Sequence, residues 1–128
     1  MANRFSDHVV LVTGGGSGIG LACSRRFAEE GAKVFVAQRS LSDEFVTIQV
    51  DLSQPEAAKQ AIDAVIAQAG KLNVLVNNAG TISPIGHLDT FDSDAFAQTF
   101  DVNVVGVHRM IKAALPKLEA SKGAIVSE

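Results

Sequence analysis

The sequence contains the stretch Thr13-Gly14-Gly15-Gly16-Ser17-Gly18-Ile19-Gly20. Its run of glycines joins a predicted strand to a predicted helix, and this arrangement is the main evidence for the fold. Before it, Val9–Thr13 is a short apolar run typical of a strand buried on both faces. After it, apolar residues recur at helical spacing from Ile19 to Glu30, and Gly31 is a natural stop. In this context backbone amides and the helix dipole favour a phosphate. The sequence therefore predicts a nucleotide-binding loop; the alternative is an ordinary glycine-rich turn.

The glycines of this loop have separate expected roles. Gly14 can take the turn without a Cβ, and Gly20 lets the helix sit close on the sheet. Gly16 and Gly18 let backbone amides approach a pyrophosphate. The spacing is G-x-x-x-G-x-G, which differs from the general dinucleotide fingerprint, and no Gly-Lys-Ser/Thr follows as in a Walker A loop.

Along the rest of the chain, short β-branched runs alternate with Ala-rich segments of helical period. Further strands are expected at Lys33–Ala37, Phe45–Val50, Val74–Asn77 and Ala124–Ser127, and further helices at Ser53–Gly70 and Asp92–Glu119. Only Gln38–Glu44 separates the second and third strands, which is too short for a crossover helix. This order predicts one α/β domain over residues 1–128, built on a doubly wound parallel sheet.

Three expectations concern how the helices begin, pack and end. The apolar residues of the first helix share one face, with Cys23 expected in the core, and they are Ile19, Ala22, Cys23 and Phe27. The second helix is expected to open with Ser53 as its cap and Glu56 three residues later. The helix at 92–119 carries Phe96, Phe100, Val104, Val107, Ile111 and Leu115, and Pro116 is expected to bend or shorten its last turns.

Composition excludes several chemistries. The 128 residues include no Tyr, no Trp, three His and one Cys. One thiol cannot form an internal disulfide or a multi-cysteine zinc site, and the histidines lack metal-site spacing, so no metal is predicted. A net charge of −3 without basic clusters argues against nucleic acid and anionic membrane as partners. No apolar run approaches the ~20 residues of a membrane span and no signal segment is recognised, so a cytoplasmic protein is expected.

Five motifs, in register over nearly the whole chain, carry a resemblance to a known family. Thr13–Gly20 resembles the T-G-x-x-x-G-I-G loop of the short-chain dehydrogenases/reductases. Asp51-Leu52 is similar to the family's Asp-hydrophobic pair beside the adenine ring, and Asn77-Asn78-Ala79-Gly80 to its N-N-A-G motif. Asn103 matches the helix asparagine of its catalytic relay, and Gly123–Ser127 resembles the stretch that leads to its active-site serine.

The resemblance implies a Rossmann-like sheet in strand order 3-2-1-4-5, truncated after its fifth strand. It also implies an oxidoreductase that transfers hydride between NAD(P) and a small alcohol or carbonyl substrate. By the same resemblance Asn103 is a catalytic residue. The positions that match the family's cofactor site are Gly14, Gly16, Ser17, Gly18, Ile19, Gly20, Gln38, Arg39, Asp51, Leu52, Asn78, Ala79 and Gly80.

The polar residues among these positions also have other roles open to them. Asp51 ends a strand at the carboxyl edge of the sheet, where ligands bind in such folds, but it could instead cap the helix that follows. Asn77 and Asn78 could bind a ribose or brace a turn. Asn103 is polar within an apolar stretch, and the residue alone leaves a structural hydrogen bond and a catalytic water site equally open.

The residues after the second strand bear on the choice between NADP and NAD. An acid about twenty residues past the glycines would bind the ribose 2′-hydroxyl of NAD, but Gln38 stands there. Arg39 could pair with a 2′-phosphate through its guanidinium fork, or be a solvated loop charge. Ser17 stands where many NADP users of the family carry a second basic residue. NADP(H) is the preferred prediction and NAD the alternative.

The family's proton-transfer residues are absent from the sequence. Its chemistry uses a serine and a Tyr-x-x-x-Lys pair, and this chain has no tyrosine. Ser127 matches a strand position before the family's serine and does not replace it. The chain is therefore expected to be a truncated, cofactor-binding half that is inactive alone. The alternative is a non-catalytic dinucleotide-binding or interaction module. The resemblance also implies a homo-oligomer in which subunits pair through the helix at 92–119.

Overall fold

The computed structural model describes residues 3–80, 88–90 and 92–128 and shows a five-stranded parallel sheet. Its strands are β1 (Val9–Thr13), β2 (Lys33–Gln38), β3 (Val46–Gln49), β4 (Val74–Asn77) and β5 (Ala124–Ser127). The order is β3-β2-β1-β4-β5, which confirms the Rossmann-like α/β class and the predicted 3-2-1-4-5 arrangement. As expected, the described residues between β2 and β3 form no helix.

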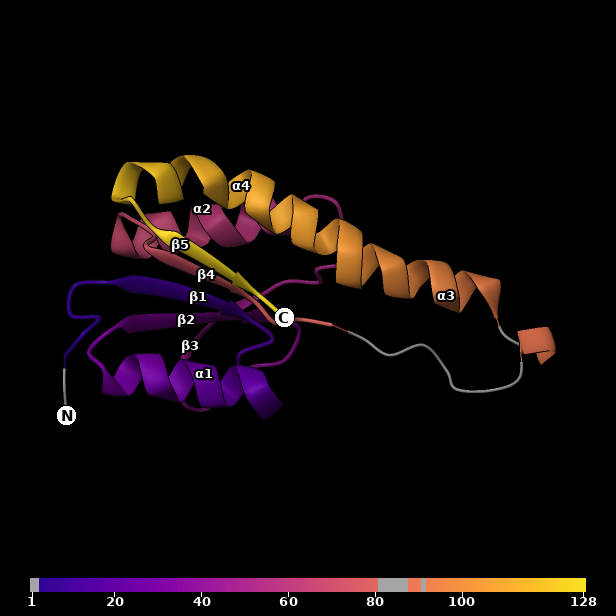
Figure 1. Cartoon of the computed structure of the whole chain (residues 1–128), viewed down its shortest axis with the longest axis horizontal. Helices are drawn as coiled ribbons and strands as arrows, with labels where there is room; N and C mark the ends of the chain where they lie inside the picture. The colour runs from indigo at the N-terminus through magenta and orange to yellow at the C-terminus, as the bar shows by residue number, and fades with distance from the viewer. Residues whose placement is uncertain (1–2, 81–87, 91) are drawn as a thin grey trace.

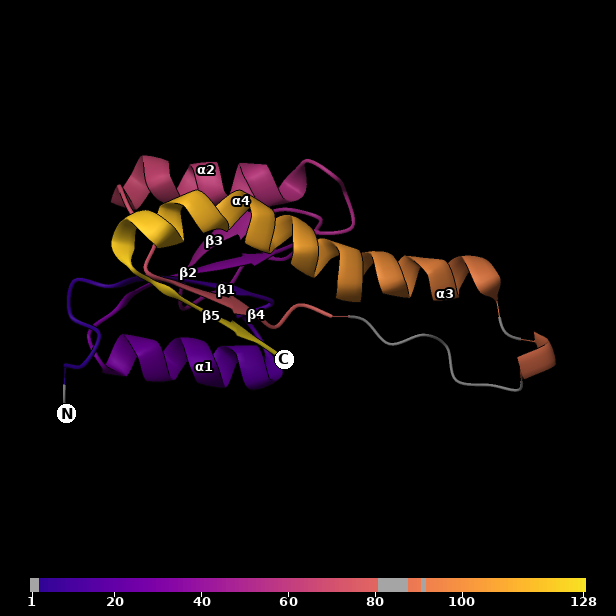
Figure 2. The ribbon, with the colours of Figure 1, turned by 45° about the horizontal axis from the view of Figure 1, so that its top comes forward.

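Helices cover both faces of the sheet (Figure 1). The elements are α1 (Gly18–Glu29), α2 (Ala57–Ala69), the 3-10 turn η1 (Leu88–Thr90), α3 (Ser93–Phe100), the π-helical turn η2 (Asp101–Val105) and α4 (Gly106–Ser121). Helix α1 packs on one face and α2 and α4 on the other, while α3 extends away from the sheet (Figure 2). None of the described helices is long and apolar enough to cross a membrane.

Successive side chains along each strand point to opposite faces of the sheet, so the core is divided into two layers. Leu11, Phe35 and Leu75 are completely buried and pack with residues of α2 and α4. Val12 and Val36 point to the opposite face, in the layer that also contacts α1. Because β1, β2 and β4 are covered on both sides, they are apolar at nearly every position, as the sequence predicts for central parallel strands.

The face of α1 that meets the sheet differs from the expected one. Gly20 and Ser24 are its buried residues, while Ile19 is 64% exposed and Ala22 is also exposed. Small residues bring the helix close to the sheet, so size rather than hydrophobicity selects this face. The prediction of an apolar buried face is therefore wrong for Ile19 and Ala22.

The start of α2 also differs from the prediction. The helix begins at Ala57 with Glu56 at its N-cap and no side-chain capping bond. The Ser53 hydroxyl instead donates to Asp51 Oδ1 at 2.7 Å, so Ser53 does not cap the helix. The predicted end is confirmed, since Gly70 adopts the left-handed conformation with φ 78°.

The predicted helix at 92–119 is helical from Ser93 onward, with Asp92 as its N-cap, but it is not one regular α-helix. The π turn η2 separates α3 from α4, and Pro116 lies inside α4, which continues to Ser121 without being shortened there. The buried residues of α4 include Met110, Ala114 and Leu118. Several residues of the predicted apolar series are instead half-exposed, namely Phe96, Phe100, Val104 and Leu115.

Candidate dinucleotide-binding site

A cavity of about 470 Å³ lies at the carboxyl edge of the sheet, the edge where ligands bind in folds of this kind. Seven predicted cofactor residues line it: Gly14, Gln38, Arg39, Asp51, Leu52, Ala79 and Gly80. The sequence did not predict a cofactor role for its other lining residues: Ala37, Val50, Ser53, Ala95, Gln98, Thr99 and Val102. The helical ones have no motif of their own, so only the fold brings them to the site.

The glycine loop bends at two left-handed positions, Gly14 with φ 64° and Gly18 with φ 54°. A Cβ added to Gly20 would lie 2.3 Å from the Gly14 carbonyl oxygen, so the contact of α1 with the loop requires glycine there. A Cβ on Gly18 would meet no described atom within 4 Å, because this glycine faces open space. The loop thus combines a tight packing contact with an open side that a ligand can approach.

The N-terminus of α1 is suited to an anion. Ser17 is the N-cap and makes no side-chain capping bond, and the first turn carries no acidic residue. The first amides of a helix lack intrahelical partners, and the helix dipole adds partial positive charge. A pyrophosphate fits this donor set without competing with a carboxylate.

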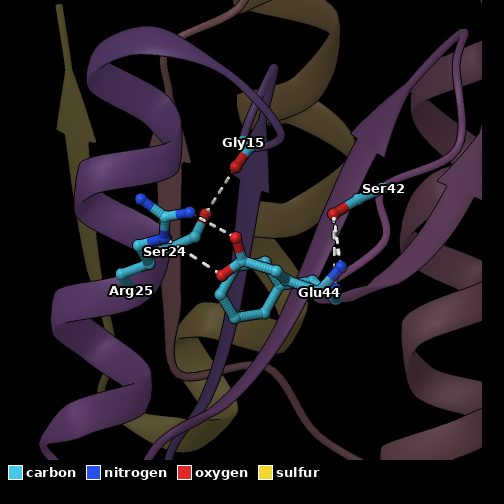
Figure 3. Close-up of polar contacts among 6 residues, drawn as sticks. Gly15, Ser24, Arg25, Ser42 and Glu44 are labelled. Carbon is cyan, nitrogen blue, oxygen red and sulfur yellow. Dashed lines mark hydrogen bonds and ion pairs between the residues drawn. The ribbon is translucent and has the colours of Figure 1, made fainter.

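Two side chains that were not assigned this role hold the loop in place. The Ser24 hydroxyl is completely buried. It shares its single proton between the carbonyl oxygen of Gly15, at 3.0 Å (Figure 3), and that of Gly20, at 2.9 Å. Gln38 Oε1 accepts from the Gly16 amide at 2.8 Å, so this amide, which was expected to face a pyrophosphate, is paired with a side chain. The side-chain amide of Gln38 is itself held in place, because its Nε2 donates to the Ser40 carbonyl oxygen at 2.9 Å.

Thr13 connects the ends of β1 and β4. Its hydroxyl oxygen accepts from the amides of Asn78 at 3.0 Å and Ala79 at 2.9 Å, and Asn78 Nδ2 donates to the Gly14 carbonyl at 3.2 Å. These bonds brace the turn after β4, which is one of the roles left open for the asparagines. Sequence reasoning placed Thr13 in the loop motif but gave it no function; a hydroxyl at the end of a buried strand was the available signal.

Asp51 accepts two hydrogen bonds from Ser53, from its amide at 3.0 Å and from its hydroxyl at 2.7 Å. The hydroxyl bond is the largest cause that lowers the pKa of Asp51 from its ordinary value, the amide bond is next, and the nearby charge of Arg39 adds to them. Asp51 is therefore a stable carboxylate on the cavity wall. It shapes the turn before α2 without capping the helix.

The loop between β2 and β3 carries Arg39 on the cavity wall, with the Arg39 side chain exposed. Glu44 anchors this loop to α1 through a two-bond ion pair with Arg25 (Figure 3), which lowers the pKa of Glu44 and raises that of Arg25. Ser42 accepts from the Glu44 amide at 3.2 Å. The backbone of the loop is therefore fixed while the guanidinium of Arg39 stays accessible.

Asn103 lies within the π turn η2 and is not among the residues that line the cavity. It is nevertheless close to the site, since a Cβ added to Gly80 would lie 3.2 Å from Asn103 Oδ1. Two motifs far apart in the sequence therefore meet at this point. Among the described residues no cluster of His, Cys, Asp or Glu is arranged to hold a metal ion.

The fold is a Rossmann-like α/β domain with a cavity at the carboxyl edge of its sheet, and comparison with known proteins gives its family. Residues 8–127 match the family model for short chain dehydrogenases, and the chain belongs to this family.

Characterised relatives are dehydrogenases. L-fucose dehydrogenase of Bos taurus is 32% identical over 136 aligned positions, which cover 99% of this chain and 50% of that protein. Cis-1,2-dihydrobenzene-1,2-diol dehydrogenase of Pseudomonas putida is 36% identical over 137 positions, covering 96% of this chain and 50% of that protein. The chain thus spans about half the length of the relatives it matches.

Two solved dehydrogenase structures are similar to this chain over nearly its whole length. Thermoplasma acidophilum aldohexose dehydrogenase in ligand-free form has a TM-score of 0.91 and 32% identity, over 99% of this chain and 51% of that one. NAD⁺-bound xylitol dehydrogenase has a TM-score of 0.87 and 28% identity, over 97% of this chain and 53% of that one.

Proposed function

We propose that this chain binds NADP(H) in the cavity at the carboxyl edge of the sheet, with NAD(H) as the weaker ligand. The observation that carries the proposal is the position of Arg39 on the cavity wall next to Gln38, where β2 ends without a carboxylate. A guanidinium there can pair with a 2′-phosphate, and the neutral amide of Gln38 does not repel it.

Each part of the proposed site has a physical task. The amides at the start of α1 hold the pyrophosphate, and the open side of Gly18 admits it. Asp51 and Leu52 border the adenine, and Ala79 and Gly80 border the ribose on the nicotinamide side. When bound, the cofactor supplies or accepts a hydride, while the chain orients it against the sheet edge.

We further infer that the whole activity is oxidoreduction of a small alcohol or carbonyl compound, in a cytoplasmic protein. Asn103, beside Gly80, would contribute to proton relay in that reaction. The 128 residues contain no tyrosine that could serve as acid or base, so this chain alone is proposed to bind the cofactor without turnover.

Calorimetric titration of the chain with NADP⁺ and NAD⁺ tests the proposal. The expected result is a lower dissociation constant for NADP⁺, because Arg39 attracts the 2′-phosphate. Tighter binding of NAD⁺ would contradict the preference, and no binding of either would contradict the function. Carbonyl-dependent oxidation of NADPH by this chain would contradict its proposed inactivity.

A further inference from the structure

The π turn η2 changes the direction in which α3 and α4 present their side chains. The Gly106 amide donates to the Asp101 carbonyl five residues back, where a regular α-helix would use a carbonyl four residues back. The turn therefore absorbs one extra residue, a rotation of about 100° between the two helices. Val102, within the turn, lines the cavity, and Met110, on α4 beyond it, packs in the core.

The π turn is also a direct neighbour of the cavity wall. A Cβ added to Gly106 would lie 3.2 Å from the Asp101 carbonyl oxygen and 3.3 Å from that of Leu52, a cavity residue. On the other side of the turn, α3 contributes Ala95, Gln98 and Thr99 to the same wall. The orientation of this wall relative to the sheet is therefore set through η2.

One ion pair spans the turn. Arg109, on α4, places Nη1 3.3 Å from Oδ1 of Asp101, the first residue of the π turn. Both side chains are about one-third exposed or less, and Nη1 itself is buried without a well-formed hydrogen bond to any described residue. The attraction is therefore chiefly between charges, and exclusion of water from Nη1 reduces its screening.

We propose that Arg109 is a positioning residue of the dinucleotide site, acting through Asp101 to hold the π turn and with it the α3 wall of the cavity. Neither Asp101 nor Arg109 lines the cavity; the pair acts on the wall formed by Val102 and its α3 neighbours. The proposal rests on the proposed function in one respect, that this cavity takes a dinucleotide.

Two charge-removing variants distinguish positioning from a general electrostatic effect by whether each one strengthens or weakens NADP⁺ binding. If charge alone mattered, Asp101→Asn would strengthen binding of the anionic NADP⁺ and Arg109→Met would weaken it, and the two changes would cancel in the double variant. If the pair positions the wall, each single variant weakens binding, and the double variant is no weaker than either single one.

The experiment titrates NADPH and follows the fluorescence of its reduced nicotinamide ring. We expect Asp101→Asn and Arg109→Met each to raise the dissociation constant about fivefold, a size common for coupled neighbouring residues. Arg109→Lys should retain most of the affinity, since a point charge suffices for an interaction without hydrogen-bond geometry. Lys112→Met, which removes an exposed charge from the same helix, is the matched control and should change binding little.

Hydrogen exchange of the Gly106 amide reports on the π turn independently of binding. In Arg109→Met it should become faster, and in Lys112→Met it should not. Tighter binding by Asp101→Asn, unchanged binding by Arg109→Met, or unchanged exchange at Gly106 in Arg109→Met would overturn the role of the pair. Failure of the unmodified chain to bind NADPH and NADH would instead overturn the proposed function, and the positioning role with it.

Discussion

At the scale of single residues, Gln38 shows how one side chain can serve two tasks. Its Oε1 holds the Gly16 amide and its Nε2 holds the Ser40 carbonyl, so the side chain connects the glycine loop with the loop after β2. It also leaves the end of β2 uncharged beside Arg39. The sequence identified Gln38 by its position, but the two hydrogen bonds required the structure.

The substitution Gln38→Glu tests this position. The carboxylate keeps an acceptor for the Gly16 amide but faces the proposed 2′-phosphate and loses the donor to Ser40. We expect the ratio of NADP⁺ to NAD⁺ affinity to fall about tenfold, because like charges repel in the cavity. Calorimetric titrations with both cofactors measure the ratio; Gln38→Met, which adds no charge, is the control. A ratio unchanged by the carboxylate would contradict a 2′-phosphate at this position.

Glu30 is a buried carboxylate that the sequence did not predict, since it lies on the charged side of its helix pattern. Its side chain is 2% exposed, and Oε2 accepts from Arg4 and Arg26, each at 2.9 Å. The hydrogen bond from Arg4 is the largest cause that lowers the pKa of Glu30. These bonds attach the segment before β1 to the end of α1.

Removal of this charge by Glu30→Gln should make stability less dependent on pH. Because the folded-state pKa of Glu30 is lowered, its stabilisation is present above the ordinary pKa of glutamate and is lost as pH falls through the folded-state value. Urea unfolding should show the variant less stable than the parent chain near neutral pH, with the difference narrowing in acid. Glu29→Gln, an exposed neighbour, serves as the control. A difference constant with pH would contradict this role.

At the scale of elements, the glycine loop and α1 depend on two glycines for different reasons. Gly20 is in contact with the Gly14 carbonyl, so there is no space for a side chain at this position. Gly18 has open space around it, but its φ of 54° is unfavourable for residues with a side chain.

This contrast predicts unequal effects of the same substitution. Gly18→Ala should destabilise the chain by about 1 kcal/mol through backbone strain. Gly20→Ala should cost at least about 2 kcal/mol and weaken NADP⁺ binding, because a Cβ forces α1 away from the loop. Urea unfolding and titration measure both effects. If Gly20→Ala were the milder change, the packing of α1 on Gly14 would not be as described.

The elements also show where pattern reading succeeds and fails. The central strands were predicted within about a residue of their ends, because full burial requires continuous apolar runs. The faces of the helices were predicted less well. In α1 close approach selects Gly20 and Ser24, and in α4 the buried residues are Met110, Ala114 and Leu118 instead of the predicted series. Neither close approach nor an extra residue per turn is visible in hydrophobic periodicity.

At the scale of the whole molecule, the sheet topology was predictable from the sequence because five motifs occur in register. The helical wall of the cavity was not predictable, because its residues belong to no motif.

The fold also leaves apolar side chains exposed to solvent on α3, η2 and α4. Phe96, Phe100 and Val104 are 48%, 50% and 55% exposed along α3 and η2, and Leu115 is 43% exposed on α4. A surface of this kind is typical of association, and we propose that the chain forms homo-oligomers through 92–119.

Sedimentation velocity over a range of concentrations tests this proposal. The parent chain should associate, and Phe100→Asp combined with Val104→Asp should raise the dissociation constant at least about tenfold by placing charges in an apolar contact. Gln68→Asp, at an exposed position of α2, controls for added charge. A parent chain that stays monomeric at every concentration would count against association through this surface.

The most direct test of the central claim, a dinucleotide held at the carboxyl edge of the sheet, is an NMR titration of the ¹⁵N-labelled chain with NADP⁺. Saturating shifts are predicted for amides of the glycine loop and the strand ends: Gly14, Gly18, Asp51, Leu52, Ala79 and Gly80. Amides at the opposite edge, Lys33, Asn73 and Gly123, should remain unchanged. An absence of shifts, or shifts confined to the opposite edge, would contradict the claim.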